Sequence, residues 1–194
     1  MTANNTANVS KLGYIGRQPT TKRNSDSWFT PEVYLDSVRT VLTEITLDPF
    51  SDSKANDIVK AVHFFNEQQD GLSQNWKVSD SCKVFMNPPY SSGMVKQCCA
   101  RFVEGWHQKE FIEGIILVNN ATETKWFQSL LNEATAICFT DHRISFWNSD
   151  GKVVSNNTRG QAFFYFGINA NFFNKQFQKH GYCQALDNDL YTRW

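Results

Sequence analysis

Apolar residues in this chain recur with two different spacings, which predict strands in some segments and helices in others. Short runs rich in β-branched and aromatic residues are typical of buried strands, and they occur at residues 45–47, 61–65, 84–85, 111–118, 134–139 and 161–167. Apolar residues at helical spacing predict a helix after Pro31 and another over residues 93–106. Strands that alternate with helices over residues 30–167 predict an α/β fold with a doubly wound, mostly parallel sheet and an antiparallel last strand.

Polar residues mark several turns between these elements. Thr30 is expected to be the N-cap of the first helix and Pro31 its first residue, because proline is favoured at that position. Thr122 or Thr124 is expected to cap the helix that follows the strand at 111–118. Residues 148–151 (Asn-Ser-Asp-Gly) predict the turn of a hairpin.

The two ends of the chain differ in composition from its middle. Residues 1–26 are polar and include four basic residues, which predicts a flexible N-terminal arm. Residues 171–194 carry an aromatic residue every few positions among Asn and Gln. A packed tail, a dimer contact and a small recognition appendage all fit that C-terminal composition, whereas residues 27–170 are predicted to hold the main domain.

Composition narrows the class of protein. The 194 residues are 41% hydrophobic, which fits one globular domain, and 19 basic residues balance 19 acidic ones, so any nucleic-acid surface must be local. The five cysteines lack paired Cys-x-x-Cys spacing, which argues against a zinc site or a disulfide framework. No apolar stretch reaches the roughly 20 residues of a membrane span and no signal peptide is evident, so an intracellular protein without metal or membrane partner is expected.

The sequence with the clearest chemistry is Asn87-Pro88-Pro89-Tyr90, directly after the apolar run Val84-Phe85. Proline cannot donate a hydrogen bond to a sheet, so the strand must end where the two prolines begin. The carboxyl end of a strand in an open α/β sheet is where ligands bind. An amide, a carbonyl held by proline and an aromatic ring suit a planar heterocycle that carries an amino group, although an ordinary loop would have the same sequence signal.

This tetrapeptide resembles the catalytic motif of amino-methyltransferases that use S-adenosylmethionine. Four further motifs follow the order found in the phage Dam-type DNA N6-adenine methyltransferase family, and they are Thr30-Pro31, Asp48-Pro49, Asp70-Gly71-Leu72 before Trp76, and Arg143-Ile144-x-Phe146. The turn from Asp48 to Asn56 is poor in glycine, which excludes an ordinary dinucleotide fingerprint but is similar to the turn of that family. The resemblance covers most of residues 30–167.

The resemblance implies a Rossmann-like class I methyltransferase fold with a seven-stranded sheet, in which residues 27–170 form the catalytic domain. It implies methylation of adenine N6 in double-stranded DNA, with S-adenosyl-L-methionine as cofactor and with the base extruded from the duplex. It also implies a location in the cytoplasm of a bacterial cell or a phage-infected host. The catalytic residues that it implies are Asn87, Pro88, Pro89 and Tyr90.

Binding residues also follow from the resemblance and from the expected loops. Contacts to the cofactor are expected from Trp28, Thr30, Pro31, Asp48, Pro49, Ser51, Asn56, Asp70, Gly71, Leu72 and Asn87. Contacts to DNA or to the target base are expected from Ser91, Ser92, Lys96, Arg143, Phe146, Trp147 and Arg159. For Phe146 and Trp147, a hairpin with inward-facing aromatic rings is an equally good interpretation.

Three alternative functions remain compatible with the sequence. Cytosine N4 is a chemically related target, although serine more often replaces the asparagine of the motif there. Protein glutamine methyltransferases use the same turn but normally carry a glycine-rich cofactor loop. A subunit that binds DNA through this fold without catalytic activity is the third. The DNA recognition sequence and the oligomeric state do not follow from the residues.

Overall fold

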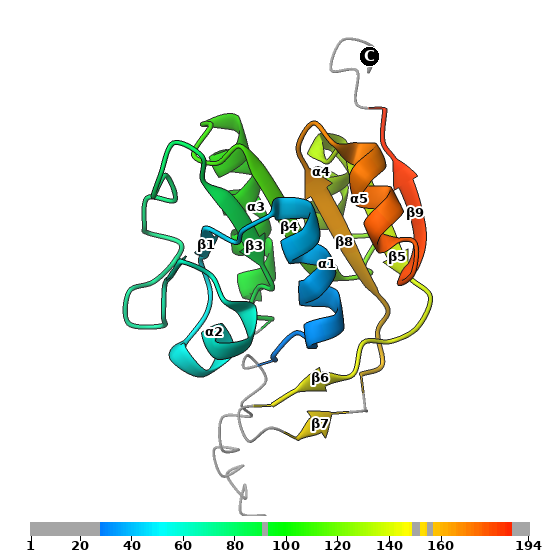
Figure 1. Cartoon of the computed structure of the whole chain (residues 1–194), viewed down its shortest axis with the longest axis horizontal. Coiled ribbons are helices and arrows are strands. Elements are labelled where there is room, and N and C mark those ends of the chain that lie inside the picture. Colours follow the sequence, from blue (N-terminus) through cyan, green and yellow to red (C-terminus); the bar gives the residue numbers. More distant parts are fainter. Residues whose placement is uncertain (1–27, 91–92, 149–151, 155–156, 188–194) are drawn as a thin grey trace, which may run out of the picture.

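The computed structural model describes residues 28–90, 93–148, 152–154 and 157–187. Its main feature is a seven-stranded sheet with the strand order β2-β1-β3-β4-β8-β5-β9 (Figure 1). The strands are β1 (Leu47–Asp48), β2 (His63–Phe64), β3 (Lys83–Met86), β4 (Glu113–Asn119), β5 (Ala136–Thr140), β8 (Gln161–Phe166) and β9 (Gly181–Ala185). The mixed α/β class and the seven-stranded sheet agree with the sequence-based prediction.

Two strands of the sheet run against the others. Strands β2, β1, β3 and β4 pair in parallel, and β8 pairs antiparallel with both β4 and β5. Strand β9 pairs antiparallel with β5 at the edge of the sheet. The strand predicted at residues 161–167 is antiparallel as expected, and β9, which was not predicted, follows it as a second antiparallel strand.

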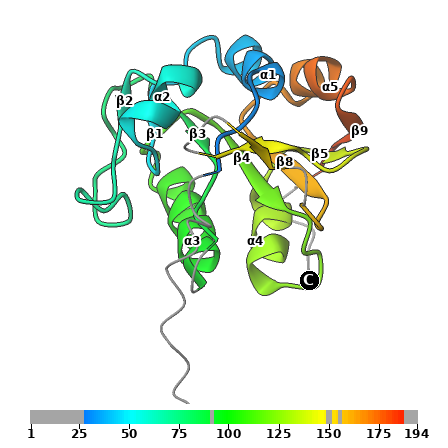
Figure 2. The ribbon, with the colours of Figure 1, turned by 90° about the horizontal axis from the view of Figure 1, so that it is seen from below.

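Within the described residues, five helices cover the two faces of this sheet. They are α1 (Glu32–Leu42), α2 (Ser53–Val59), α3 (Met94–His107), α4 (Lys125–Glu133) and α5 (Ala170–Phe177). Figure 2 shows α1, α2 and α5 on one face and α3 and α4 on the other. Side chains of β4 alternate between these layers, since Ile115 and Leu117 join the core under α1 whereas Ile116 and Val118 join the core under α3. Burial on both faces explains why this strand reads as a continuous apolar run.

The C-terminal segment is part of this packed structure. Phe173 and Phe177 of α5 are fully buried, and their rings stack with centroids 4.3 Å apart. Phe177 also contacts Phe163 of β8, at 5.0 Å between centroids. Of the roles that fit the aromatic-rich segment, packing against the core is the one that the structure shows for α5 and β9.

Two helix starts test the capping predictions. Thr124 is the N-cap of α4, and its side chain accepts a hydrogen bond from the Phe127 N–H, as predicted. The prediction for α1 is wrong, because Pro31 is the N-cap, with an extended backbone at φ −60° and ψ 144°, and no side chain caps this helix. Thr30 lies one residue further out, where its hydroxyl has another partner.

A short hairpin stands apart from the main sheet. Strand β6 (Phe146–Trp147) pairs antiparallel with β7 (Val153–Val154), which confirms the predicted hairpin. Trp147 also forms a bridge with Phe29, because the Phe29 N–H donates to the Trp147 carbonyl at 2.8 Å and the Trp147 N–H donates back at 3.1 Å. The hairpin therefore lies beside the segment that leads into α1, as Figure 1 shows.

The topology fixes where a ligand can approach. After β1 the chain continues to β2 on one side, and it then returns to form β3 on the other side of β1. Such a reversal of strand order leaves a crevice at the carboxyl ends of the two strands, where open α/β sheets bind ligands. Asp48 ends β1, and Asn87 follows β3 at the same edge.

Candidate active site

The side-chain amide of Asn87 is held by the segment that precedes α1. Its Nδ2 lies 2.9 Å from the Trp28 carbonyl and 3.3 Å from the Thr30 hydroxyl oxygen. A backbone carbonyl can only accept, so the contact with Trp28 requires that the atom is the nitrogen. Both amide hydrogens are thereby directed at the protein, and Oδ1 is the atom with which this side chain can accept a hydrogen bond from a ligand.

Thr30 is therefore a partner of Asn87 rather than a helix cap. The residue is almost fully buried, and its hydroxyl oxygen faces the Asn87 amide, 57 positions further along the chain. The Thr30 hydroxyl thus helps to orient Asn87, and the expected contact of Thr30-Pro31 with the cofactor stays a prediction.

Tyr90 is anchored to the neighbouring strand. Its hydroxyl oxygen accepts a hydrogen bond of 2.7 Å from the Asn119 N–H at the end of β4. Burial raises the pKa of the Tyr90 phenol, and this hydrogen bond lowers it only in part. The phenol is therefore neutral at physiological pH, and its hydroxyl holds the ring in a fixed position at the carboxyl edge of the sheet.

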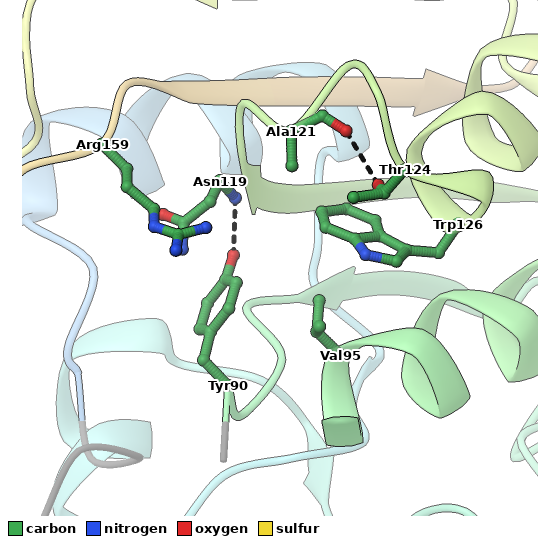
Figure 3. A pocket seen from close by; sticks show the side chains of 7 residues that line it. All are labelled: Tyr90, Val95, Asn119, Ala121, Thr124, Trp126 and Arg159. Carbon is green, nitrogen blue, oxygen red and sulfur yellow. Dashed lines mark hydrogen bonds between the residues drawn. The ribbon is translucent and has the colours of Figure 1, made fainter. Parts of the chain in front are cut away.

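The ring of Tyr90 lines a cavity of about 310 Å³. Figure 3 shows Tyr90 on one side of it and Trp126 on the other, with Val95 and Ala121 between them. Arg159 contributes a guanidinium group on the Tyr90 side. Polar and apolar side chains share its lining, and its volume lies at the lower end of the range of about 300–1,000 Å³ that is usual for small-ligand sites.

Asp48, at the end of β1, is a buried acid. Only 4% of the residue is exposed. Burial raises the pKa of its carboxyl to about 7, although the Phe50 N–H, 3.2 Å from Oδ1, and the nearby Ser51 hydroxyl act in the opposite direction. A carboxyl group with this pKa is costly to ionise alone and becomes much easier to ionise next to a cationic ligand.

A second turn packs directly on the one that Asp48 begins. A Cβ atom on Gly71 would lie 1.9 Å from the Pro49 carbonyl oxygen, so only glycine allows this approach. The Gly71 carbonyl accepts a hydrogen bond of 2.8 Å from Nε1 of Trp76, which is fully buried. The spacing of the Asp-Gly-Leu motif from Trp76 thus has a structural reason, because the indole fixes the turn against β1.

Other residues expected to contact the cofactor have mixed positions. Ser51 Oγ is buried beside the Asp48 carboxyl, whose pKa it lowers, but it makes no hydrogen bond of standard geometry among the described residues, so it is a candidate to bind a ligand. Asp70 is exposed, and its Oδ1 accepts a hydrogen bond from the Leu72 N–H at 3.2 Å. Asn56 uses both ends of its amide to bind the backbone of Ala61, at 2.9 and 3.1 Å, which gives it a structural role at the end of α2.

The hairpin residues expected to contact DNA divide into buried and exposed ones. Phe146 is 7% exposed and packs edge-to-face against Trp28, with ring centroids 6.2 Å apart, so it belongs to the core rather than to a DNA surface. Trp147 is 41% exposed. Arg143, between β5 and the hairpin, is also exposed.

The remaining residues that were expected to contact DNA or the base differ in exposure. Lys96 in α3 and Arg159 before β8 are exposed. Ser91 and Ser92 lie outside the described residues. Pro88 is buried and Pro89 is half-buried, directly after the end of β3.

The sequence did not single out two residues that help to build this site. Gln161 is buried at the start of β8, and its Nε2 donates to Asn119 Oδ1 at 3.1 Å and to the Arg159 carbonyl at 2.8 Å, while its Oε1 accepts from the Ile144 N–H at 2.8 Å. A glutamine next to an otherwise apolar run was the available signal. The second residue is Trp126, whose place facing Tyr90 has no local sequence signal.

Among the described residues, no three His, Cys, Asp or Glu side chains come together as a metal site would require. Within those residues, no helix has both the length and the apolar character needed to cross a membrane.

Comparison with known proteins identifies the family. The family described as DNA N-6-adenine-methyltransferase (Dam) matches residues 17–179, a range that includes the turn at Asn87, the turn at Asp48 and the hairpin. No curated protein sequence matches the chain. The family match confirms the resemblance drawn from the five motifs, and because it extends over far more than half of the sequence, the chain belongs to the Dam family of DNA N6-adenine methyltransferases.

Proposed function

We propose that this protein methylates adenine N6 in double-stranded DNA, that it uses S-adenosyl-L-methionine, and that transfer takes place at the turn from Asn87 to Tyr90. Membership of the family supports the DNA adenine specificity. The observation that carries the proposed site is the orientation of Asn87, whose two amide hydrogens are engaged by Trp28 and Thr30. Its amide oxygen is thereby committed to accepting from a ligand.

The residues around β1 fit a cofactor of this kind. A buried acid with a raised pKa suits the ammonium group of an amino acid moiety, and the buried Ser51 hydroxyl beside it can bind a further polar group. The tight contact of Gly71 with Pro49 supports a fixed shape for this crevice. When bound there, S-adenosyl-L-methionine supplies an electrophilic methyl group.

Asn87 and Pro88 then position the amino group of the base. Asn87 Oδ1 and the Pro88 carbonyl oxygen each accept a hydrogen bond from the amino group. These two hydrogen bonds turn the nitrogen lone pair out of conjugation with the ring and toward the methyl carbon. Precise placement of the reacting atoms accounts for most of the rate in a transfer of this type. The base must leave the duplex first, because its amino group is otherwise paired and stacked.

Exposed cationic and aromatic side chains near this edge are the proposed DNA contacts. Lys96, Arg143 and Arg159 are exposed near the ends of β3, β5 and β7, and Trp147 is exposed on the hairpin. Cations bind phosphates regardless of sequence, so a local cluster is compatible with a net charge of zero over the chain. The soluble, intracellular location expected of a DNA-modifying enzyme in a bacterial or phage-infected cell is part of this proposal.

Transfer of labelled methyl from S-adenosyl-L-methionine to unmethylated duplex DNA tests the proposal. The product is digested to nucleosides, and wild type is compared with Asn87→Ala. Asn171→Ala is the control, because Asn171 is exposed in α5, which follows the opposite end of the sheet. We expect label in N6-methyladenine for wild type and the control, and a loss of at least about 100-fold for Asn87→Ala, since oriented positioning is worth several kcal/mol.

The other outcomes separate the alternatives. Label in N4-methylcytosine would show that cytosine is the target base and that the same turn acts on its amino group. Binding of S-adenosylhomocysteine and DNA without any methyl transfer would leave a DNA-binding subunit with this fold. Equal activity in Asn87→Ala and wild type would refute the proposed role of the turn.

A further inference from the structure

The cavity beside Tyr90 has two aromatic walls from distant parts of the chain. Tyr90 belongs to the turn after β3, whereas Trp126 is the second residue of α4, which follows β4. Figure 3 shows their rings on opposite sides of the space, with the aliphatic side chains of Val95 and Ala121 between them. The two rings thus bound this space from opposite sides.

The position of Trp126 is fixed by the start of its helix. The Thr124 side chain donates to the Ala121 carbonyl at 2.8 Å and accepts from the Phe127 N–H at 3.3 Å. The Trp126 indole packs edge-to-face on Phe127, at 5.9 Å between centroids, and Phe127 is fully buried. Trp126 itself is only half-buried, so its indole retains surface that the core does not cover.

We propose that Trp126 forms the second wall of the target-base site, so that the extruded base lies between its indole and the ring of Tyr90. The inference rests on the proposed function and adds to it a residue that positions the base. An extruded base is commonly stacked between aromatic or apolar side chains. The cavity of about 310 Å³ has room for one base.

The polar groups at the Tyr90 side fit the rest of a purine. Arg159 offers only hydrogen-bond donors, which suit the acceptor nitrogens of an adenine ring. Gln161 links this arginine to the wall of the site, because its Nε2 binds both the Arg159 carbonyl and Asn119 Oδ1. Asn119 in turn donates its backbone N–H to the Tyr90 hydroxyl. The buried Gln161 side chain thus connects the backbone of Arg159 with the strand end that holds Tyr90.

The hairpin is the competing location for the second aromatic ring. Phe146 is excluded by its burial against Trp28, which leaves Trp147 as the candidate there. If the second ring is Trp126, its replacement by alanine should slow methyl transfer and that of Trp147 should not. If the second ring is Trp147, the opposite is expected.

The experiment compares Trp126→Ala, Trp126→Phe and Trp147→Ala with Tyr182→Ala, an exposed aromatic control on the edge strand β9. Single-turnover methyl transfer to unmethylated duplex DNA is measured, together with the affinity for S-adenosylhomocysteine and the melting temperature. We expect Trp126→Ala to lower the transfer rate about 10- to 100-fold, because stacking of one base on one aromatic ring contributes about 1–3 kcal/mol. Trp126→Phe is expected to remain within about fivefold of wild type, and cofactor affinity should not change.

A fluorescent base gives a readout of stacking itself. The methylated positions in the wild-type product define a site, and a duplex carrying 2-aminopurine at that position is mixed with each variant and S-adenosylhomocysteine. Stacking quenches 2-aminopurine, so the complex with Trp126→Ala should be brighter than the complexes with wild type, Trp126→Phe and Tyr182→Ala.

Three results would overturn the inference. The first is a wild-type rate of methyl transfer in Trp126→Ala. The second is a loss of transfer rate and a gain of 2-aminopurine fluorescence that occur only in Trp147→Ala. The third is a loss of cofactor affinity in both Trp126 variants, which would show that Trp126 has a structural role. Absence of methyl transfer by the wild-type protein itself would instead refute the proposed function, and the inference with it.

Discussion

At the scale of single residues, the contact between Thr30 and Asn87 separates two roles for the Thr-Pro motif. The motif predicted a cofactor contact, whereas the structure has the Thr30 hydroxyl 3.3 Å from the Asn87 amide nitrogen. Thr30→Val removes the hydroxyl and keeps the shape of the side chain. We expect methyl transfer to slow about two- to tenfold, the effect of one net hydrogen bond, with unchanged affinity for S-adenosylhomocysteine. A weaker affinity at an unchanged transfer rate would restore the cofactor role.

Asp48 should make the stability of the ligand-free protein depend on pH. Burial raises the pKa of this carboxyl to about 7 in the folded protein, against about 3.9 in an unfolded chain. Between these values the folded state holds a proton that the unfolded state has released, so stability falls as pH rises and is level above pH 7. From pH 5 to pH 8 this one group removes about 2.5 kcal/mol from the free energy of unfolding, most of it below pH 7.

Urea unfolding of the wild type and Asp48→Asn at pH 5 and pH 8 measures this contribution. The asparagine variant lacks the group, so it should gain stability relative to wild type as the pH is raised. Asp57→Asn, at an exposed position of α2, is the control and should keep the pH dependence of the wild type. A parallel response of wild type and Asp48→Asn would mean that the carboxyl titrates normally.

At the scale of elements, the turn at Gly71 and the turn at Pro49 act as one unit. A Cβ atom at Gly71 would meet the Pro49 carbonyl oxygen at 1.9 Å, and the backbone on both sides would have to move. We expect Gly71→Ala to lower the free energy of unfolding by about 3 kcal/mol or more and to abolish cofactor binding. Gly160→Ala is the control, because its new Cβ would meet only the Asn120 Cβ, at 3.8 Å. Calorimetry with S-adenosylhomocysteine and thermal unfolding give both quantities, and normal binding by Gly71→Ala would show that the contact is dispensable.

The predictability of each element followed the strength of its local pattern. Strands β3, β4 and β8 were found from the sequence because both of their faces are buried and each contains an uninterrupted apolar run. Strand β9 was not predicted from the sequence, because its residues are at least partly exposed at the edge of the sheet and form no apolar run. Helix α2 is short and buries only Val59, so it has no apolar stripe to detect.

At the scale of the whole molecule, α5 and β9 should be required for folding. Together with α1, helix α5 covers the face of the sheet to which Phe163 and Tyr165 of β8 point, and β9 shields the edge of β5. A chain that ends after Asn169 would expose this apolar face and leave β5 unpaired on one side. We expect it to aggregate or to unfold without a cooperative transition, whereas a chain that ends after Asp187 should melt cooperatively. Circular dichroism during heating distinguishes the two, and a cooperative melt of the shorter chain would assign α5 and β9 a peripheral role.

The sequence located most of the candidate site but not its connections. The motifs at Asp48, Asp70 and Asn87 could be found because each lies at a strand end or turn with a local sequence signal. The contacts of Asn87 with Trp28 and of Gln161 with Asn119 join residues 59 and 42 positions apart. Such contacts depend on the order of strands in the sheet, which local patterns do not specify.

The bridge between Phe29 and Trp147 has a consequence for how the enzyme would discriminate between DNA sequences. The segment that pairs with the hairpin at Phe29 is the same one that holds the Asn87 amide through Trp28 and Thr30. If the hairpin contacts DNA as proposed, we expect an ill-fitting duplex to displace this segment and with it the Asn87 oxygen that accepts a hydrogen bond from the amino group. Selectivity would then appear in the rate of methyl transfer, with slow turnover on non-cognate DNA sites that the protein still binds.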